Sequence, residues 1–401
     1  MASSAGAAIE RPKVNLLLFV ILGAIGGLTP LAIDLYLPAM PAIATALNST
    51  PGAVQLTLTA YAAGFAIGQL IHGPLADSYG RRPVLLLGIG AFALAAMASA
   101  QVEQVETLTF IRTLQGFAGA AAAVIVQAVV RDMFDREEFS RAMSFVTLVL
   151  TMAPLVAPLL GGHLADWFGW RAIFWSLALF SLLVIALVLW KIPETLAAEH
   201  RQPLKLSATL KNYASLLRNS TVMGLIFAGA FSFGGMFVFV TAGSFVYIEI
   251  YQIPAQYFGY LFGLNILSMI ALTMVNSRLV RRMGSHAMLR LGLTLQLTAG
   301  IGLFFTWLLD GGITAVVVFV MLFIGTISMI GSNAMGLLLS GYGHMAGTAS
   351  SLTGTLRFGM GSVMSAVVAA LPGDKAWPML FIMALCALCS ASCYWIFGRK
   401  A

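Results

Sequence analysis

The stretch Gly73-Pro-Leu-Ala-Asp-Ser-Tyr-Gly-Arg-Arg-Pro83 lies between two long apolar runs and is the densest polar signal in the first hundred residues. Its glycines and prolines predict a tight turn. Asp77, Arg81 and Arg82 would each cost about 2.5 to 3.5 kcal/mol in hydrocarbon, so we predict that this turn lies at a membrane face. Its two arginines indicate the cytoplasmic face, because short loops rich in Lys and Arg stay inside the cell.

The composition of the whole chain predicts a polytopic membrane protein. Of the 401 residues, 60% are hydrophobic and 9% are charged, compared with about 25% charged residues in an ordinary soluble domain. A net charge of +7 would suggest a nucleic-acid partner for a soluble protein, but here we attribute it to cytoplasmic loops that face anionic lipid. We therefore expect a monomer in the lipid bilayer with no nucleic-acid partner.

Apolar runs long enough to span a bilayer predict twelve transmembrane helices. The runs cover residues 14–37, 53–72, 84–100, 107–130, 143–162, 170–190, 221–248, 256–275, 286–308, 313–336, 346–371 and 377–397. The longest polar segment divides the chain into an N-terminal six-helix bundle (1–190), a cytoplasmic linker (191–219) and a C-terminal six-helix bundle (220–401). The predicted fold class is an all-α polytopic membrane protein built from two pseudo-symmetric six-helix bundles.

The distribution of basic residues supports this topology, with both termini in the cytoplasm. All but four of the 22 Lys and Arg residues fall in predicted cytoplasmic segments. Arg171 and Lys375 lie on the outer side, and Arg112 and Arg357 lie within helices. Such a bias fixes the orientation of short loops. We expect the first apolar run to be retained as a span, because it lacks a convincing cleavage site.

The two halves also repeat a local pattern. Leu279 and Gly284 stand 204 positions beyond Leu75 and Gly80, and both loops carry paired arginines. Such repeats are typical of transporters that consist of two related bundles. Arg281 takes the place that corresponds to Asp77, so we do not expect the second loop to act as a gate.

Three ionisable residues fall within the predicted spans, where their cost makes each a functional candidate. Asp34 is the one carboxylate, and Arg112 and Arg357 are the two bases. Asp34 lies near the outer end of the first helix and Arg112 near the outer start of the fourth, so we expect the two to approach each other through a shared cavity. Alternatively, Asp34 is a helix-end residue in contact with water. Arg357 is either a gate or a buried structural ion.

Three segments resemble signatures of the major facilitator superfamily of transporters. The turn from Gly73 to Arg82 is similar to that family's loop between helices two and three. The segment Leu108-Thr-Phe-Ile-Arg-Thr-Leu-Gln-Gly-Phe-Ala-Gly119 resembles its helix-four signature, whose arginine is associated with proton transfer. The segment Ala153-x-x-x-Ala-Pro-Leu-Leu-Gly-Gly162 resembles the helix-five signature of its drug:proton antiporters, with alanine at two positions where glycine is usual. Small residues still allow close helix packing there.

Further segments are similar to the Bcr/CflA subfamily of drug-resistance antiporters, and the resemblance covers nearly the whole chain. They are Asp34-Leu-Tyr-Leu-Pro-Ala-Met-Pro41, Arg131-Asp-Met-Phe134, Glu137-Glu-Phe-Ser-Arg141, Ser332-Asn-Ala-Met335, His344-Met-Ala-Gly-Thr-Ala-Ser-Ser351 and Arg357-Phe-Gly359. The resemblance implies proton-driven export of bicyclomycin and other small drugs across the bacterial inner membrane. Asp34 and Arg112 would then couple transport to protons, with no other cofactor.

The resemblance also implies a gate on the cytoplasmic side. In the family this loop latches the two bundles together, so we expect Asp77, Arg81 and Arg82 to act as gating residues. Asp77 could also favour the positive start of helix eleven, near His344 to Ser351. In helix five, Pro158, Gly161 and Gly162 are further gating candidates. Alternatively, the loop is a solvated turn that only sets the topology.

Side-chain type suggests which residues contact the substrate. Aromatic and methionine side chains tolerate many ligand shapes, and an amide within the membrane needs a partner. The candidates are Tyr36, Tyr61, Gln69, Gln115, Phe231, Phe233, Met236, Phe237, Phe239 and Asn265. For any single phenylalanine, helix packing or lipid contact is the alternative.

Other functions compete with drug export. A related transporter of a metabolite, such as an amino acid or sugar, is the nearest alternative. A channel and a membrane-embedded enzyme are also conceivable, but an enzyme needs a cluster of acids, bases or metal ligands within the spans. The sequence shows no metal motif: Cys386, Cys389 and Cys393 are interpreted as small core residues. The charged run from Arg131 to Glu138 is interpreted as a solvated loop.

Overall fold

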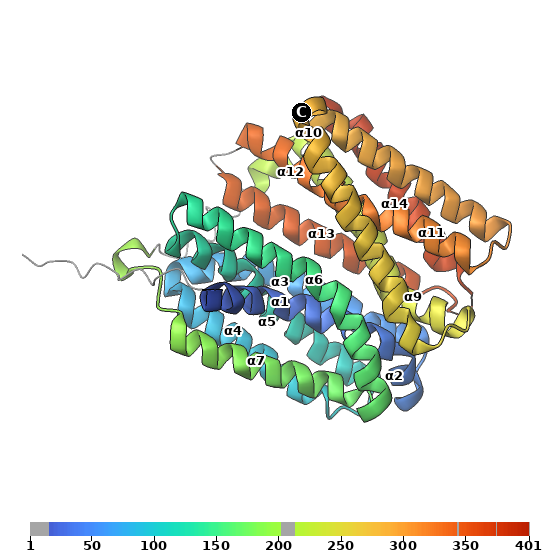
Figure 1. Ribbon diagram of the computed structural model, residues 1–401, viewed down its shortest axis with the longest axis horizontal. Helices are drawn as coiled ribbons and strands as arrows, with labels where there is room; N and C mark the ends of the chain where they lie inside the picture. Colours follow the sequence, from blue (N-terminus) through green and yellow to red (C-terminus); the bar gives the residue numbers. More distant parts are fainter. Residues whose placement is uncertain (1–15, 202–212, 343–344, 374, 401) are drawn as a thin grey trace, which may run out of the picture.

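Helices are the only regular secondary structure in the part of the chain that the computed structural model describes, which comprises residues 16–201, 213–342, 345–373 and 375–400. This agrees with the predicted fold class (Figure 1). The first half contains α1 (Leu16–Asp34), η1 (Leu37–Ala39), α2 (Met40–Ala46), α3 (Pro51–Tyr79), α4 (Arg81–Ser99), α5 (Val105–Met133), α6 (Arg136–Phe168) and α7 (Arg171–Lys191). Then follow η2 (Ala198–His200), α9 (Ser220–Ser244), the π-helical turn η3 (Phe245–Ile250), α10 (Ala255–Leu308), α11 (Ile313–Gly325), α12 (Ile327–Tyr342), α13 (Ala346–Ala369), α14 (Trp377–Ile396) and η5 (Gly398–Lys400).

The helix α10 accounts for two of the predicted spans. Its 54 residues would extend roughly 80 Å, far more than the roughly 30 Å of a hydrocarbon core. Gly284 leaves the helical conformation (φ 78°, ψ 160°), so the chain turns back there. Within the part of the chain that the structure describes, eleven helices are long and apolar enough to cross a membrane. With α10 counted twice, the described residues contain the twelve predicted spans.

Gly80 and Gly284 occupy matching places in the two halves. Each ends a membrane helix with a positive φ, 105° for Gly80 and 78° for Gly284. L side chains rarely adopt this conformation, whereas glycine does so at little cost. A side chain at Gly80 would also overlap the carboxylate of Glu194. The repeat in the sequence thus corresponds to a repeated backbone turn.

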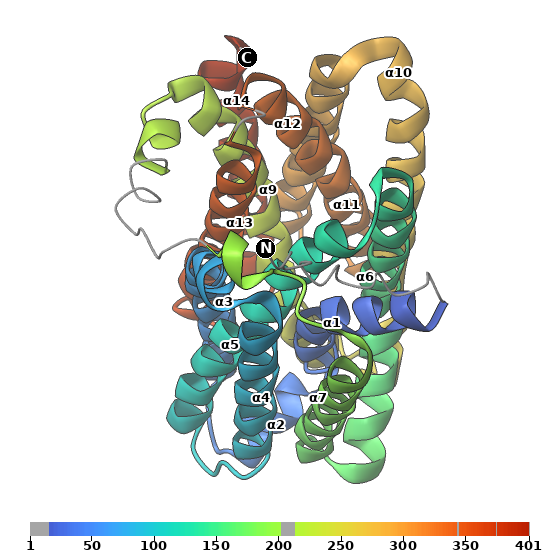
Figure 2. The same ribbon diagram turned by 90° about the vertical axis from the view of Figure 1, so that its left-hand side faces the viewer.

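The helices gather into two groups. In Figure 1 the blue-to-green helices α1–α7 form the lower group and the yellow-to-red helices α9–α14 form the upper group. Figure 2 shows α13 beside α3 and α10 beside α6, and these pairs join the groups. The predicted domain boundaries at 190 and 220 stay a prediction, and residues 202–212 of the predicted linker lie outside the described residues.

Small polar side chains hold α3 against α13. The Ser351 hydroxyl donates a hydrogen bond to the Gln69 carbonyl oxygen at 3.2 Å. In the same way Ser362 donates to the Thr59 carbonyl oxygen at 3.1 Å. Short hydroxyl side chains let two helix backbones approach closely within a membrane.

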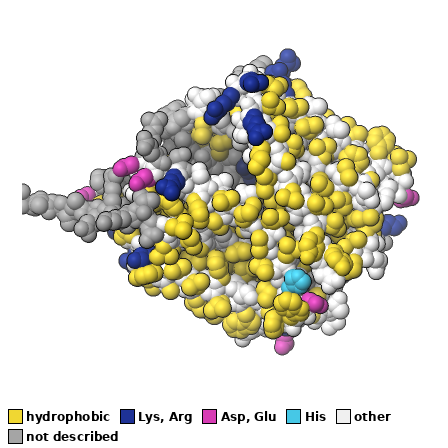
Figure 3. Space-filling view, in the orientation of Figure 1, with side chains coloured by type: hydrophobic (Ala, Val, Ile, Leu, Met, Phe, Trp, Pro, Cys, Tyr) yellow, Lys and Arg dark blue, Asp and Glu magenta, His cyan; other side chains and the backbone are white. Residues whose placement is uncertain are grey.

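Much of the outer surface is apolar. Leu87 and Leu179 expose 73% and 71% of their surface, respectively. Figure 3 shows yellow hydrophobic side chains across the middle of one face, with most of the visible Lys and Arg side chains toward the top and left. A broad apolar surface of this kind suits contact with lipid tails.

Candidate functional site

A cavity of about 540 Å³ lies between the two groups of helices. The first half contributes α1 and α6, and the second contributes α9, α10, α11, α12 and α13. Most of the wall is apolar: Pro30, Ile33, Pro154, Phe233, Met236, Phe237, Val240, Phe262, Ile266, Met269, Ile324, Ile327, Gly331, Met335 and Phe358. The volume falls within the range of small-molecule sites.

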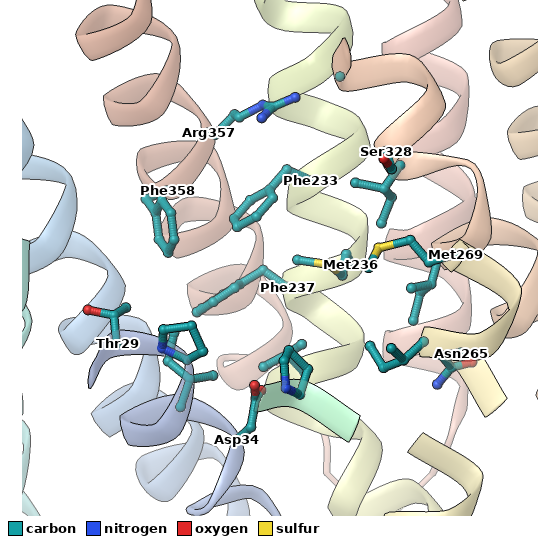
Figure 4. A pocket seen from close by; sticks show the side chains of 18 of the residues that line it. Thr29, Asp34, Phe233, Met236, Phe237, Asn265, Met269, Ser328, Arg357 and Phe358 are labelled. Atoms are coloured by element: carbon teal, nitrogen blue, oxygen red, sulfur yellow. The ribbon is translucent and has the colours of Figure 1, made fainter. Parts of the chain in front are cut away.

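A few polar groups interrupt this apolar wall, as Figure 4 shows. They are Thr29, Asp34, Asn265, Ser328, Ser332 and Arg357. The Asn265 side chain is buried, and neither its oxygen nor its nitrogen has a hydrogen-bond partner among the described residues. An unpaired amide in such a place is costly, so a ligand or water that binds it would gain free energy.

Asp34 is the last residue of α1, and it lies in the cavity wall with 6% of its surface exposed. Pro38 favours the end of α1, because it lacks the N–H that would bond to the Asp34 carbonyl in a longer α-helix. It lies within the 3₁₀ turn η1. The chain then continues through η1 and α2 to Ala46. Asp34 therefore lies farther from the outer end of the first span than the sequence suggested. Its carboxylate forms no hydrogen bond or ion pair with another described residue.

Arg112 is fully buried on α5, within the first half. Its Nη1 donates to the Gln115 side-chain oxygen at 2.8 Å, and its Nη2 donates to the Ala32 carbonyl oxygen at 3.0 Å. The rings of Tyr36 and Tyr61 lie 4.9 and 4.4 Å from the guanidinium carbon. Aromatic faces and hydrogen-bond acceptors stabilise a buried guanidinium, so Arg112 is held without a carboxylate.

The expected approach of Asp34 and Arg112 through a shared cavity is not found. Arg112 is absent from the cavity wall, and no ion pair joins it to Asp34. Arg112 contacts the same helix end through the backbone instead, because it binds the carbonyl oxygen of Ala32, two residues before Asp34. That carbonyl is available because the helix ends at Asp34.

Four of the ten predicted substrate contacts lie in the cavity wall: Phe233, Met236, Phe237 and Asn265. The other six lie elsewhere. Tyr36, Tyr61 and Gln115 surround Arg112, and Tyr61 reaches the wall only through a hydrogen bond of 3.3 Å from its hydroxyl to Thr29.

The remaining three predicted contacts lie against other protein side chains or backbone, outside the cavity wall. The side chain of Gln69 lies against Gly354, where α3 meets α13. Phe231 packs against Phe227, with ring centroids 6.2 Å apart. Phe239 lies behind the wall residue Phe262 at 6.0 Å. The substrate-binding roles of all ten residues stay predictions.

Arg81 is the centre of a charged network at the turn between α3 and α4. It is 6% exposed, and its Nη1 lies 2.5 Å from the Asp77 carboxylate. Its Nε donates to the Asp132 carboxylate at 3.3 Å. The Glu194 carboxylate accepts hydrogen bonds from the backbone N–H groups of Arg81 and Arg82, at 2.9 and 3.3 Å.

Asp132 and Glu194 were not among the residues predicted to form this network. Asp132 belongs to the charged run that was interpreted as a solvated loop, which is wrong for this residue because it pairs with Arg81. The sequence gives one indication of the role of Glu194: it is a carboxylate that closely follows the sixth apolar run, and so lies at the same membrane face as Arg81. Asp77 binds Arg81 of its own turn. His344, at the expected start of helix eleven, lies outside the described residues.

The glycines of the helix-five motif differ in their surroundings. A side chain at Gly161 would overlap the backbone carbonyl of Leu35, so α6 and the end of α1 touch there. At Gly162 the nearest atom, the Ala255 carbonyl oxygen, would lie 3.7 Å from an added Cβ. Pro158 lies inside α6, one turn away. Their gating roles stay predictions.

The described residues contain no group of three or more His, Cys, Asp or Glu side chains that could hold a metal ion. The candidate site thus consists of an apolar cavity, one carboxylate, one guanidinium and an amide. Such a set suits reversible binding of a small organic molecule and of a proton. It offers no obvious nucleophile with an activating base.

Comparison with known families identifies the chain. The family model described as Major Facilitator Superfamily matches residues 22–366. The chain belongs to the Major Facilitator Superfamily. A relative in this superfamily, named Bicyclomycin resistance protein homolog, from Haemophilus influenzae (strain ATCC 51907 / DSM 11121 / KW20 / Rd), is 43% identical over 98% of both chains. A Chloramphenicol resistance protein from Pseudomonas aeruginosa is 32% identical over 88% of this chain and 84% of that protein.

Solved structures of the superfamily have the same fold. A D-xylose-proton symporter covers 93% of this chain and 96% of its own, with a TM-score of 0.72 and 16% identity. The nucleoside transporter NupG covers 94% and 99%, with a TM-score of 0.76 and 13% identity. At these identities the likeness concerns the fold alone. This member of the Major Facilitator Superfamily is a multi-pass membrane transporter and not an enzyme.

Proposed function

We propose that the protein is a proton-coupled antiporter that exports small drugs such as bicyclomycin. The observation that carries this proposal is Asp34, a carboxylate without a partner in the wall of an apolar cavity between the two halves. A carboxylate that has lost water binds a proton more readily than one in solvent, and renewed contact with water reverses this. Asp34 would thus bind a proton in one conformation and release it in the other.

The chemistry of the cavity supports drugs rather than sugars as substrates. Phe233, Phe237 and Met236 supply aromatic and thioether surface, which accommodates many shapes. A sugar site needs many hydrogen-bonding groups, and this wall has few. The relatives named for resistance to bicyclomycin and chloramphenicol support the same substrate class.

The arrangement of the halves supports a rocking mechanism. At the predicted outer side, the Ser244 hydroxyl lies 3.8 Å from the Met40 sulfur, and Gly52 is pressed against the carbonyl of Ala369. These contacts must separate before the cavity opens outward. Arg112 keeps the end of α1 in place through Ala32, so Asp34 moves with the first half as a rigid unit.

The energy of one proton is sufficient for this exchange. A unit charge that crosses about 150 mV releases roughly 3.5 kcal/mol, enough for a drug gradient of a few hundredfold. The protein would work as a monomer in the bacterial inner membrane, with both termini in the cytoplasm, and would use protons but no bound cofactor or nucleic acid. The bias of basic residues supports this orientation.

Reconstituted vesicles test the proposal. Purified protein is placed in liposomes, a pH gradient is imposed, and bicyclomycin uptake is measured with and without an uncoupler. We expect accumulation that the uncoupler abolishes. An excess of amino acids or sugars should not compete. Accumulation of those metabolites in place of the drug would favour the metabolite transporter, and uptake that ignores the gradient would contradict proton coupling.

A further inference from the structure

Arg357 is the second charged residue in the cavity wall, and it lies on α13 at the end of the cavity away from Asp34 (Figure 4). Its guanidinium forms no hydrogen bond or ion pair with another described residue, and its Nε is buried without a partner. A guanidinium carries five N–H donors. Left unsatisfied at the edge of an apolar cavity, they are costly.

Two glycines lie against this side chain, and one of them makes room for it. An added Cβ at Gly229 would lie 3.7 Å from both Nε and Nη2 of Arg357. A Cβ at Gly331 would overlap Nη2. Since Gly331 itself lines the cavity, the guanidinium is held where a bound molecule can reach it. Lipid-facing arginines usually extend to the membrane surface instead.

The charges of the wall favour one kind of ligand. Asp34 is the only carboxylate and Arg357 the only base among its described residues. When Asp34 carries a proton, the wall has a net charge of +1. When Asp34 is ionised, it lies at the far end from Arg357 and does not pair with it. In both states Arg357 offers unpaired donors to an acceptor group.

We propose that Arg357 selects substrates with an anionic or strongly hydrogen-bond-accepting group, such as a carboxylate or an array of carbonyls, attached to an apolar body. The apolar body would lie against Phe233, Phe237 and Phe358. Lipophilic cations would be disfavoured, because a like charge in a cavity of low dielectric is repelled and gains no partner in return. This inference names the substrate class of the site and rests on the proposed drug-binding role of the cavity.

Binding to purified protein in lipid nanodiscs tests the selection with three probes: nalidixate, a carboxylate; bicyclomycin, which is neutral; and tetraphenylphosphonium, a cation. We expect the parent to bind nalidixate at least about tenfold more tightly than the cation. Arg357→Gln should weaken nalidixate binding by about tenfold or more, weaken bicyclomycin binding less, and strengthen cation binding. Arg357→Lys, which keeps the charge, should retain part of the preference.

Two further variants separate selection from folding. Gly331→Ala should displace the guanidinium and shift the probes in the same direction as Arg357→Gln. Arg290→Gln is the matched control and should leave all three affinities unchanged. Arg290 lies outside the cavity wall, where its Nε donates to the Tyr394 hydroxyl at 3.3 Å.

The inference is overturned if the parent fails to bind nalidixate, if it binds the cation equally well, or if Arg357→Gln weakens all three probes equally. A parent that shows this preference but does not couple bicyclomycin to protons would refute the antiporter mechanism alone.

Discussion

Arg112 donates a hydrogen bond of 3.0 Å from its Nη2 to the carbonyl oxygen of Ala32, at the end of α1 and two residues before Asp34. A cation at the carboxyl end of a helix stabilises the free carbonyl groups there. The contact therefore connects the fully buried guanidinium of Arg112 to the carboxylate of the cavity through the backbone. Asp34 is therefore held in place relative to α5 without any direct ion pair to Arg112.

Replacement of Arg112 by lysine should disrupt this connection. Lysine cannot bind the Gln115 oxygen and the Ala32 carbonyl together with a planar fork, nor stack as well on Tyr61. We expect Arg112→Lys to lower proton-coupled uptake at least about tenfold. Arg141→Lys is the control, because Arg141 is exposed and lies 6.0 Å from the Phe19 ring. Equal uptake by the Arg112 variant and the parent would refute this role.

Adjacent glycines of α6 should differ in their tolerance of a methyl group. Gly161→Ala forces a Cβ into the Leu35 carbonyl, whereas Gly162→Ala makes only ordinary contacts at 3.7 Å and beyond. Overpacking of this kind costs about 1–3 kcal/mol. Thermal unfolding of the purified variants should therefore show a lower Tm for Gly161→Ala and a parental Tm for Gly162→Ala. The reverse order would contradict the described packing of α6 on α1.

Glu194 should stabilise the cytoplasmic turn. Glu194→Gln removes one acceptor oxygen and places a donor near the Arg81 and Arg82 N–H groups. We expect a loss of about 1–3 kcal/mol in the free energy of unfolding, measured by denaturant titration of the purified protein. Glu199→Gln, at an exposed position on η2, should change it by less than about 0.5 kcal/mol. If both variants lose the same amount, the loss does not come from this turn.

Substitutions on the two faces of α9 should differ in their effect on drug affinity. Phe233 lines the cavity, whereas Phe231 packs on Phe227 away from it. Phe233→Ala should weaken bicyclomycin binding about tenfold, since an aromatic contact is worth roughly 1.5 kcal/mol. Phe231→Ala should leave affinity unchanged. Equilibrium binding to the two purified variants distinguishes the faces, and equal weakening would place the binding site elsewhere.

Much of the fold was predictable because a membrane helix requires a long run of apolar residues, which is visible in the sequence. All twelve spans appear near their predicted positions, and Gly80 and Gly284 mark equivalent turns. The surroundings of the charged residues were less predictable. Arg112 contacts the Gln115 side-chain oxygen, a backbone carbonyl and aromatic rings, and residue type alone does not specify such partners. Glu194 binds Arg81 across 113 positions, a contact that depends on how α4 packs beside α7.

Only some of the predicted substrate contacts lie in the cavity wall, because residue type does not show which side of a helix faces a cavity. Phe233 and Phe237 lie in its wall, but Phe231 and Phe239 on the same helix do not. A helix that is apolar on all sides gives no periodic signal of which face meets a cavity. The second half supplies most of the wall, including Arg357, whereas the first half supplies Asp34. This asymmetry follows from packing between helices that are distant in sequence.

Proton release upon drug binding tests the central role of Asp34 most directly. Purified protein in a weakly buffered solution at neutral pH is mixed with bicyclomycin, and the released protons are measured with a pH indicator alongside drug binding. We predict release by the parent, none by Asp34→Asn, and drug binding and a Tm close to parental values for that variant, since Asp34 has no partner to lose. Equal proton release by Asp34→Asn with intact drug binding would contradict the account.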